Sequence, residues 1–238
     1  MEGLKATLDS KGIRNFRVNG ILQVEVDELE NVKFKIKVEN RGSPAIDFDA
    51  KSSIDRGIFF KKSILGFKGD DPSFPAGQTR PLHWSFKTKD ESNIPIKINC
   101  GTSAVGEHTK VRIAYDAFEL FDLENVQISV PVKAEKAEIK KASIGRAWYD
   151  PGESIEHSKV HWSLLVIDDS NRYGSLEFLV PGAVDLSDFF PISLKFTATS
   201  TFSNLKVDIL PLRKTDDPPK FVHHKELVAA KDDYLIVV

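Results

Sequence analysis

The stretch VKFKIKV, residues 32–38, decides the fold class. Four apolar side chains alternate with three lysines, so an extended backbone places the apolar groups on one face and the lysines on the other. A period of two with one apolar face is typical of a half-buried antiparallel strand. The same rule holds in six further stretches: FRVNGILQVEV (residues 16–26), KVRIAY (110–115), VQISVPV (126–132), SLEFLV (175–180), ISLKFTAT (192–199) and LKVDIL (205–210).

Turn signals such as SKG (residues 10–12), KGDDP (68–72) and DPGES (150–154) separate these stretches at short intervals. No stretch of about 12 residues or more has a convincing helical period. Because a sheet with one apolar face must bury that face on another sheet, the predicted fold is all-β, built from antiparallel sandwiches. The strands are too many for one usual sandwich, which predicts two packed β units. KAEKAEIKKA (133–142) is short and uncapped, and we interpret it as a charged edge strand or a crossover.

Composition narrows the classes of function. The net charge of −2 disfavours a field strong enough to hold nucleic acid. One cysteine permits no intramolecular disulfide, the first residues lack a secretory signal, and no apolar run approaches the roughly 20 residues of a membrane helix. These features predict a soluble protein of a reducing compartment, the cytosol.

Catalytic and metal-binding signatures are weak. No phosphate-binding loop or nucleophile elbow occurs. His157 and His161 lie about 13 Å apart along a predicted strand, too far to share one ion, and His223 and His224 would point to opposite faces of a strand. Cys100 has no nearby base in the sequence and is interpreted as a buried structural thiol. We therefore expect no enzyme, no metal and no cofactor.

The stretch RGIFFKKSILGFK, residues 56–68, mixes large apolar and cationic side chains. If it is extended, neighbours alternate faces, and some apolar groups must lie near the surface beside lysines. Two interpretations remain open: a pair of core strands, or the aromatic and cationic wall of a peptide groove, in which an indole would be buried under cationic groups. The candidate peptide-binding residues are Phe59, Phe60, Lys61, Lys62, Ile64, Phe67 and Lys68.

Several ordered stretches resemble one family. RYGSLEFLVPG (172–182) and DFFPISLKF (188–196) resemble the C-terminal half of the mu-homology domain, and more narrowly that of the coatomer delta subunits, delta-COP. DSKGIRNFRVNGILQVEV (9–26), IPIKINC (94–100) and SSIDRGIFFKKSILGFKGDDPSFP (52–75) are similar to further parts of the same domain. The resemblance therefore covers essentially the whole chain.

The resemblance implies an elongated all-β domain in which subdomain B is inserted into subdomain A. Subdomain A would take residues 1–87 and 191–238, and subdomain B residues 88–190. It implies a non-enzymatic peptide-binding module of the COPI vesicle coat, cytoplasmic and peripheral on Golgi membranes and coated vesicles, acting in Golgi-to-ER retrograde transport. The implied partners are tryptophan-motif peptides of an Arf GTPase-activating protein and of an ER tethering subunit, and other coatomer subunits through the rest of a longer chain. Neither nucleic acid nor direct membrane insertion is expected.

Two alternatives stay open. Clathrin-adaptor mu domains of the same superfamily bind tyrosine signals of the form Tyr-x-x-Φ through two residue pairs. One pair would precede Met1, and the other falls on His224 and Glu226, where glutamate replaces the family's arginine and reverses the local charge. The second alternative is a β-sandwich that binds a small ligand, as lectin-like domains do.

Overall fold

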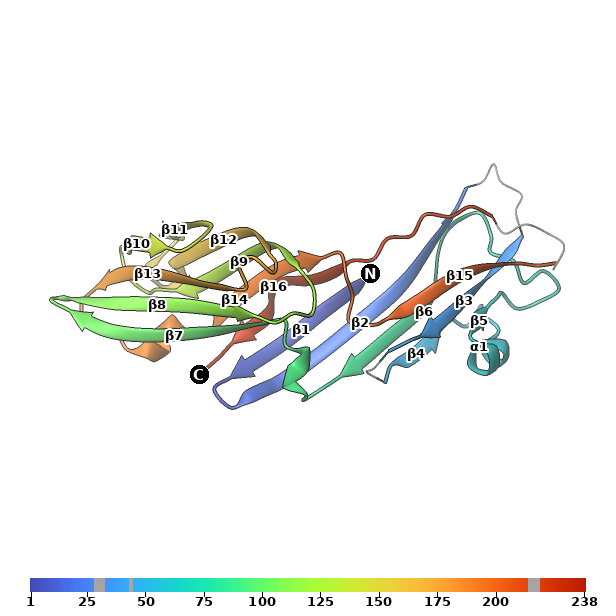
Figure 1. Ribbon diagram of the computed structural model, residues 1–238, viewed down its shortest axis with the longest axis horizontal. Helices are drawn as coiled ribbons and strands as arrows, with labels where there is room; N and C mark the ends of the chain where they lie inside the picture. Colours follow the sequence, from blue (N-terminus) through green and yellow to red (C-terminus); the bar gives the residue numbers. More distant parts are fainter. Residues whose placement is uncertain (28–32, 43–44, 214–218) are drawn as a thin grey trace. The chain divides into compact units, whose positions relative to one another are not determined.

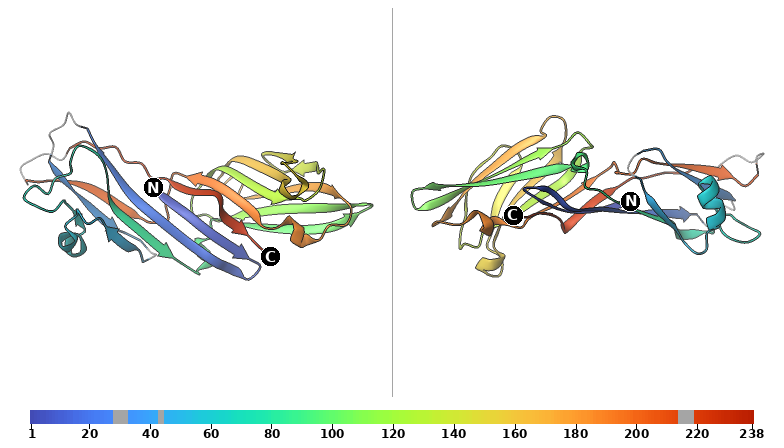
Figure 2. Two further views of the ribbon diagram at one scale, coloured as in Figure 1. Left: turned by 180° about the vertical axis from the view of Figure 1, so that it is seen from behind. Right: turned by 90° about the horizontal axis from the view of Figure 1, so that it is seen from below.

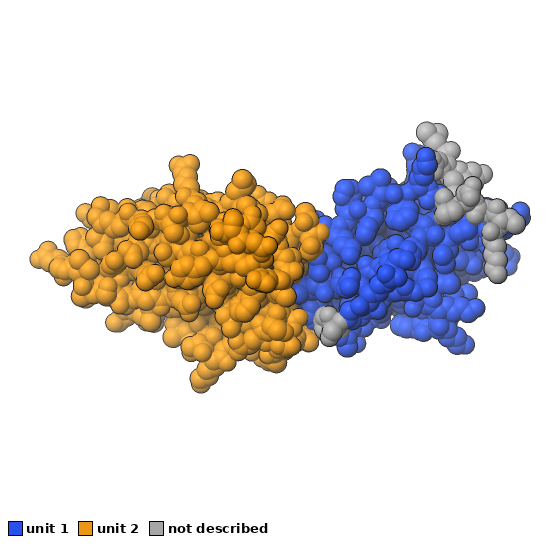
Figure 3. Space-filling view, in the orientation of Figure 1, with its two compact units in different colours: residues 1–2, 18–86, 201–226 blue, residues 3–17, 87–200, 227–238 orange. Residues whose placement is uncertain are grey.

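The computed structural model describes residues 1–27, 33–42, 45–213 and 219–238. The chain folds as two compact units, coloured separately in Figure 3. Unit 1 contains Met1–Glu2, Val18–Phe86 and Thr201–Glu226, and unit 2 contains Gly3–Arg17, Lys87–Ser200 and Leu227–Val238. Both the units and the predicted subdomains divide the chain near residue 87. They differ at the termini and at the second boundary, which is predicted at residues 190–191 and lies at residues 200–201 between the units. The subdomain boundaries stay a prediction.

The described residues form sixteen strands, one α-helix and three short 3₁₀ helices (Figure 1). In chain order these are β1 (Glu2–Asp9), β2 (Gly12–Val26), β3 (Phe34–Asn40), β4 (Asp47–Ala50), α1 (Arg56–Lys62), β5 (Ile64–Leu65), β6 (Gly77–Lys87), η1 (Glu91–Asn93), β7 (Ile96–Val105), β8 (His108–Ala117), β9 (Leu123–Pro131), β10 (Glu138–Ala142), β11 (Arg146–Asp150), η2 (Ile155–His157), β12 (Lys159–Ile167), β13 (Tyr173–Pro181), η3 (Leu186–Phe189), β14 (Ile192–Ala198), β15 (Leu205–Pro211) and β16 (Leu227–Ile236).

The all-β prediction is confirmed, and each alternating stretch falls on a strand. In β3, Phe34, Ile36 and Val38 are buried, while Lys35 and Lys37 are more exposed, because successive side chains leave opposite faces of the strand. Val32, the first residue of the stretch that decided the fold class, lies outside the described residues.

Unit 2 has a four-stranded sheet in the order β10-β13-β8-β7 and a second sheet in which β11-β12-β9-β14-β16-β1 continues into the first part of β2. Its core contains the rings of Trp162, Tyr115, Phe178 and Phe189. Of residues 133–142, predicted as a charged edge strand or a crossover, the last five form β10, which is an edge of the four-stranded sheet. Lysines on such an edge discourage pairing with another sheet.

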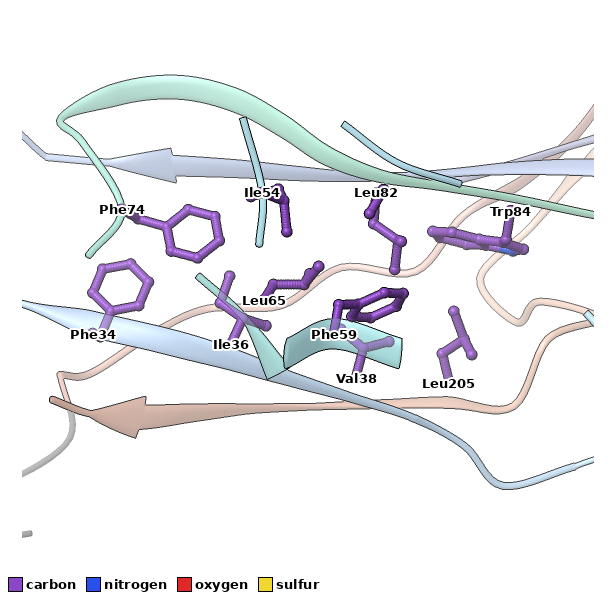
Figure 4. Close-up of a cluster of buried hydrophobic side chains, with 11 residues drawn as sticks. Phe34, Ile36, Val38, Ile54, Phe59, Leu65, Phe74, Leu82, Trp84 and Leu205 are labelled. Atoms are coloured by element: carbon purple, nitrogen blue, oxygen red, sulfur yellow. The ribbon is translucent and has the colours of Figure 1, made fainter. Parts of the chain in front are cut away.

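Unit 1 is built from two small sheets. One contains the second part of β2 with β6 and β4, and the other has the order β15-β3-β5. Figure 4 shows their apolar side chains meeting between the layers: Phe34, Ile36, Val38 and Leu205 from one side, and Leu82 and Trp84 from the other. This cluster is the hydrophobic core of unit 1.

Helix α1 corrects the expectation that residues 56–68 are extended. The Asp55 carboxylate accepts a hydrogen bond from Ile58 N at 3.0 Å and so caps the first turn. At the other end Ser63 adopts φ 57° and donates its N–H to Phe59 O at 2.7 Å. These two caps end the helix after seven residues, which is too short for a helical period to be visible in the sequence.

Helix α1 connects the edge strands β4 and β5 of the two sheets, and Figure 2 shows it beside these strands in both views. Phe59, 4% exposed, lies in the core, and its ring meets Phe48 of β4 edge-on at 5.7 Å. The Arg56 guanidinium donates to Ala50 O at 2.8 Å through Nε and so ties the helix to the end of β4. The β4 and β5 edge of unit 1 is therefore closed by α1.

The histidine and cysteine predictions have mixed outcomes. His161 lies on β12, but His157 belongs to η2 rather than to a strand and interacts through Nδ1 with Ser154 Oγ at 2.8 Å. Cys100 on β7 is half-buried rather than fully buried, and burial raises the pKa of its thiol to about 12. A thiol with so high a pKa is a poor nucleophile.

Residues 1–27, 33–42, 45–213 and 219–238 contain neither a metal cluster nor a membrane-spanning helix. No group of three or more His, Cys, Asp or Glu side chains there is arranged to hold a metal ion. No helix there has both the length and the apolar character needed to cross a bilayer.

Candidate peptide-binding groove

A groove of about 710 Å³ in unit 1 is the candidate site. It opens along the side where β2 and β15 lie, opposite the edge that α1 closes. Residues 219–226, which lead back toward β16, form part of its wall.

Apolar side chains line the inside of the groove. They come from β2 (Leu22, Val24, Val26), β3 (Phe34, Ile36, Val38) and β15 (Leu205, Val207, Ile209). The β15 and β3 residues pair directly across the sheet, Val207 with Val38 and Ile209 with Ile36, so they form one continuous surface. Leu22, Val24, Val207 and Ile209 are only partly buried. The sandwich thus leaves part of its own core surface accessible from this side.

A buried polar network fixes the inner end of the groove. The Glu2 carboxylate is fully buried and accepts hydrogen bonds from Trp84 Nε1 at 2.9 Å and from Phe202 N at 2.8 Å. It also accepts from Ser203 N at 3.2 Å and from the Ser203 hydroxyl. A buried carboxylate is tolerated when its oxygens are satisfied in this way. The network holds the Trp84 indole, which lines the groove, in one orientation.

The rim of the groove is polar and of mixed charge. Lys220 and Lys225 lie on the wall formed by residues 219–226, and Glu25 and Asp27 lie on or next to β2. On the same wall Phe221 is 53% exposed. The groove therefore offers an apolar interior, a neighbouring aromatic side chain, and charges of both signs at its mouth.

The backbone edge of β15 adds a second means of recognition. β15 is an end strand of its sheet, and among the described strands only β3 pairs with it. The N–H and C=O groups on the free side of an edge strand can pair with an added extended peptide. Backbone pairing would fix the peptide's direction, while the apolar interior would receive its side chains.

The residues predicted from the sequence lie elsewhere. The groove is lined by none of the predicted peptide-binding residues, which are Phe59, Phe60, Lys61, Lys62, Ile64, Phe67 and Lys68. Phe59 is buried in the core, Ile64 and Phe67 are half-buried, and the three lysines are exposed. Phe60 is 64% exposed. Phe60, Lys61 and Lys62 are thus exposed at the end of α1, and their role in peptide binding stays a prediction.

His223 and His224 were expected on a strand and instead lie outside any strand, exposed to solvent on the groove wall. His224 and Glu226 both line the groove. The positions that resemble the tyrosine-signal pair of adaptor mu domains therefore border this groove, with a glutamate where the pattern requires arginine.

The sequence did not reveal the groove because its lining residues have the same alternating pattern as any core strand. A period of two shows which face of a strand is apolar, but it does not show whether another element covers that face. The pattern therefore predicts that the apolar residues of β2 and β15 are covered in a closed sandwich, including Leu22, Val24, Val207 and Ile209. The sequence signal for the groove wall is FVHH, residues 221–224. These four large side chains lie in a stretch without the alternating pattern of a strand.

Comparison with known proteins gives the family. The model of the Adaptor complexes medium subunit family matches residues 1–235. Coatomer subunit delta-1 of rice (Oryza sativa subsp. japonica) is 40% identical over 222 residues, which cover 92% of this chain and 41% of the relative. Coatomer subunit delta of Arabidopsis thaliana is 40% identical over 225 residues, 92% of this chain and 42% of that protein. The chain thus spans about two fifths of the length of these relatives.

Solved structures agree with the fold. The yeast delta-COP-I mu-homology domain superimposes with a TM-score of 0.81 at 17% identity, covering 99% of this chain and 95% of the yeast chain. The same yeast domain in complex with a Dsl1 WxWxV peptide gives a TM-score of 0.79 at 18% identity, with the same coverage. The chain belongs to the Adaptor complexes medium subunit family, and its fold is that of the delta-COP mu-homology domain.

Proposed function

We propose that this chain is a non-enzymatic peptide-binding module of a coatomer coat, and that the groove of unit 1 binds tryptophan-containing linear motifs in extended conformation. The observation that carries the proposal is the open apolar groove of about 710 Å³ beside the edge strand β15. The coatomer delta relatives support a role in the coat. The peptide in the yeast complex supports the class of ligand.

The groove suits an indole for physical reasons. A tryptophan side chain buries roughly 150–250 Å² and needs one hydrogen-bond acceptor for its N–H. The interior supplies apolar surface, and the free edge of β15 supplies backbone carbonyls. A short peptide must be ordered on binding, so its affinity should be modest, on the order of micromolar, and a coat with many copies would regain strength by multivalency.

In the cell the module would work in the cytoplasm, peripheral on Golgi membranes and COPI vesicles, during Golgi-to-ER retrograde transport. Its partners would be tryptophan motifs of an ER tethering subunit and of an Arf GTPase-activating protein, while the rest of a longer chain would contact other coatomer subunits. Glu226 opposes the tyrosine-signal alternative, because the pattern of the tyrosine-binding mu domains has an arginine at this position and a glutamate reverses the local charge.

The test is a titration of the chain with three fluorescent peptides: a Trp-x-Trp peptide, its alanine-substituted copy, and a Tyr-x-x-Φ peptide. Val24→Glu and Val207→Glu place a charge in the groove and should weaken Trp-x-Trp binding by about tenfold or more, since a desolvated charge would face the indole. The matched control is Leu165→Glu on β12 of unit 2, where the side chain is 82% exposed. Circular dichroism checks that each variant is folded.

Three outcomes decide the proposal. Loss of Trp-x-Trp binding in both groove variants, but not in the control, supports it. Preference for the Tyr-x-x-Φ peptide, or no binding of either peptide, overturns it. If Phe60→Ser on α1 weakens Trp-x-Trp binding while the groove variants do not, the site belongs to the residues predicted from the sequence.

A further inference from the structure

Strand β7 is an unguarded edge of the four-stranded sheet of unit 2. It is the last strand of that sheet, and among the described strands it pairs only with β8 (Figure 1). Residues 98–105, INCGTSAV, contain neither a charge nor a proline, and residues 101–108 are all exposed. Edge strands of natural proteins are normally protected by charges, prolines or bulges, because their free backbone groups can pair with another strand.

The opposite edge of the same sheet has these protections. Strand β10 carries Glu138, Lys140 and Lys141, and its register with β13 shifts between Ile139 and Lys141, as at a bulge. The register of β7 with β8, by contrast, is continuous from Ile96 to Val105. One edge of the sheet is therefore protected against pairing and the other is suited to it.

The β7–β8 hairpin determines which backbone groups of β7 point to the free side. Val105 faces His108 across the two-residue turn Gly106–Glu107, whose glycine has φ 59°. The two residues that flank such a turn form a hydrogen-bonded pair, and bonded and non-bonded pairs then alternate along the hairpin. The odd-numbered residues of β7 thus bond to β8, and the even-numbered residues turn their N–H and C=O groups away from β8.

Two hydrogen bonds at the start of β7 agree with this alternation. Phe118 N donates to Pro95 O at 3.0 Å, which continues the series of odd-numbered bonds. Ile96 O points away from β8 and accepts from the Tyr234 hydroxyl at 2.6 Å.

Three residues present their backbone groups to the exposed part of this edge: Cys100, Thr102 and Ala104. Their side chains leave the same face of β7 as the buried Ile98, yet Thr102 and Ala104 are exposed. The opposite layer of the sandwich therefore does not cover this end of β7. Both the backbone edge and the inner face of the strand are open to a partner.

We propose that β7 pairs with β7 of a second copy of this chain, antiparallel about a two-fold axis at Thr102. Identical strands related by a two-fold axis form an isologous contact, in which each residue meets its symmetry counterpart. The two four-stranded sheets would join into one continuous sheet across the seam.

Backbone pairing and charge select the same register. With Thr102 opposite the partner's Thr102, Cys100 faces the partner's Ala104, so the three outward-facing residues of each copy pair only with one another. Each such pair exchanges two hydrogen bonds, which gives about six across the seam. The same register brings Lys97 level with the partner's Glu107, so opposite charges meet at both ends of the seam.

This charge pattern favours a second copy over an unrelated extended segment. A neutral edge accepts many strands through its backbone alone, but its own copy also supplies the matching charge at each end. A seam of this length buries less than the roughly 1,600 Å² of a standard interface, so the dimer should be weak when free in solution. An array that holds many copies side by side would raise their effective concentration and strengthen the pairing.

The experiment is sedimentation equilibrium of the 238-residue chain between about 10 µM and 1 mM, where we expect a reversible dimer with a Kd on the order of 100 µM. Thr102→Lys places like charges opposite each other and should weaken the dimer by about tenfold or more. Thr102→Pro should act in the same direction, because it removes an N–H that points to the free side and leaves the bonds to β8 in place. The matched control is Thr199→Lys, at an exposed position outside any strand.

Disulfide trapping tests the register. In a Cys100→Ser background, Thr102→Cys should form disulfide-linked dimers under copper-phenanthroline oxidation about tenfold or more faster than Thr199→Cys does. The Cα atoms of a hydrogen-bonded antiparallel pair lie about 5.5 Å apart, which is within the range that a disulfide spans. Circular dichroism checks that each variant is folded.

A chain that stays monomeric up to about 1 mM overturns the proposal. So does a dimer that both Thr102 variants leave intact, a dimer that Thr199→Lys weakens equally, or equal rates of cross-linking for the two cysteine variants. Shifts of the β7 amide resonances when Trp-x-Trp peptide is added to a monomeric chain would assign the edge to that peptide and overturn it as well. Because β7 belongs to unit 2 and the groove to unit 1, the Thr102 variants should keep Trp-x-Trp affinity, and each proposal can fail without the other.

Discussion

Gly20 lies against the indole of Trp84, which lines the groove. A Cβ atom on Gly20 would lie 1.9 Å from Trp84 Cε2, which is far inside van der Waals contact. The indole cannot move aside without giving up the hydrogen bond from its Nε1 to Glu2. Only glycine therefore fits at position 20 while this network is kept.

Gly20→Ala should destabilise unit 1 by about 1–3 kcal/mol, because the added methyl group displaces the indole and loosens the hydrogen bonds to Glu2. Urea denaturation followed by tryptophan fluorescence measures the change. Gly101→Ala serves as the control, since a Cβ there meets nothing within 4 Å. Equal stability of the two variants would show that the indole relaxes without cost.

His161 is half-buried in a cluster of polar and aromatic groups of unit 2. Its Nδ1 lies 2.8 Å from Ser129 Oγ and 3.0 Å from Gln127 Nε2, and its ring centroid lies 5.2 Å from that of Trp148. Burial lowers the pKa of His161 below its ordinary value of 6.5, and the Asp150 carboxylate, 3.6 Å from Nε2, offsets only part of this effect. The folded protein thus favours the neutral ring.

Stability should consequently fall as the pH drops through the ordinary pKa of histidine. Below pH 6.5 the unfolded chain binds a proton at this residue more readily than the folded chain does, so protonation pulls the equilibrium toward unfolding. His161→Gln removes this proton uptake, and its stability should fall less between about pH 7.5 and pH 5.5 than that of the unaltered chain. Urea denaturation at both pH values gives the two slopes, and identical slopes would contradict the assignment.

Helix α1 depends on its two caps rather than on helical propensity. It has seven residues, whereas isolated helices shorter than about 12–15 residues are marginal in water. Its caps and the buried Phe59 supply the missing stability. The sequence contained both cap residues, but a hydrophobic run of IFF next to strand patterns favoured an extended interpretation. The long strands, by contrast, were predictable because each repeats its period several times.

Asp55→Ala should destabilise the protein by about 1 kcal/mol through loss of the hydrogen bond to Ile58 N, and Asp55→Asn should retain most of that stability. Ser63→Gly should have the opposite sign and stabilise by several tenths of a kcal/mol, because φ 57° is strained for serine and relaxed for glycine. Thermal unfolding of the three variants checks these effects. A stabilising Asp55→Ala would show that the cap does not hold the helix.

Each unit is assembled from segments that are distant in the sequence. Unit 2 takes its first strand from the start of the chain and β16 from the end, and β16 lies between β14 and β1 in its sheet. Alternation could predict these strands individually, but their partners depend on contacts between residues up to about two hundred positions apart, which no local pattern records. The candidate groove was missed for the same reason, since its walls come from β2, β3, β15 and residues 219–226.

Deleting residues 227–238 should therefore disrupt unit 2 far from the deletion. The truncation removes a central strand, including Tyr234, which is fully buried and donates its hydroxyl to Ile96 O at 2.6 Å. Without β16, β14 and β1 lose their shared partner, and apolar side chains such as Phe196, whose ring meets that of Tyr234 at 5.8 Å, become exposed. We expect amide resonances of residues 88–200 to lose their native dispersion in heteronuclear NMR spectra. Tyr234→Phe, which removes only the hydroxyl, should keep it. If residues 88–190 stay folded after the deletion, they form a self-contained subdomain with the boundaries predicted from the sequence, and the terminal strands only extend its sheet.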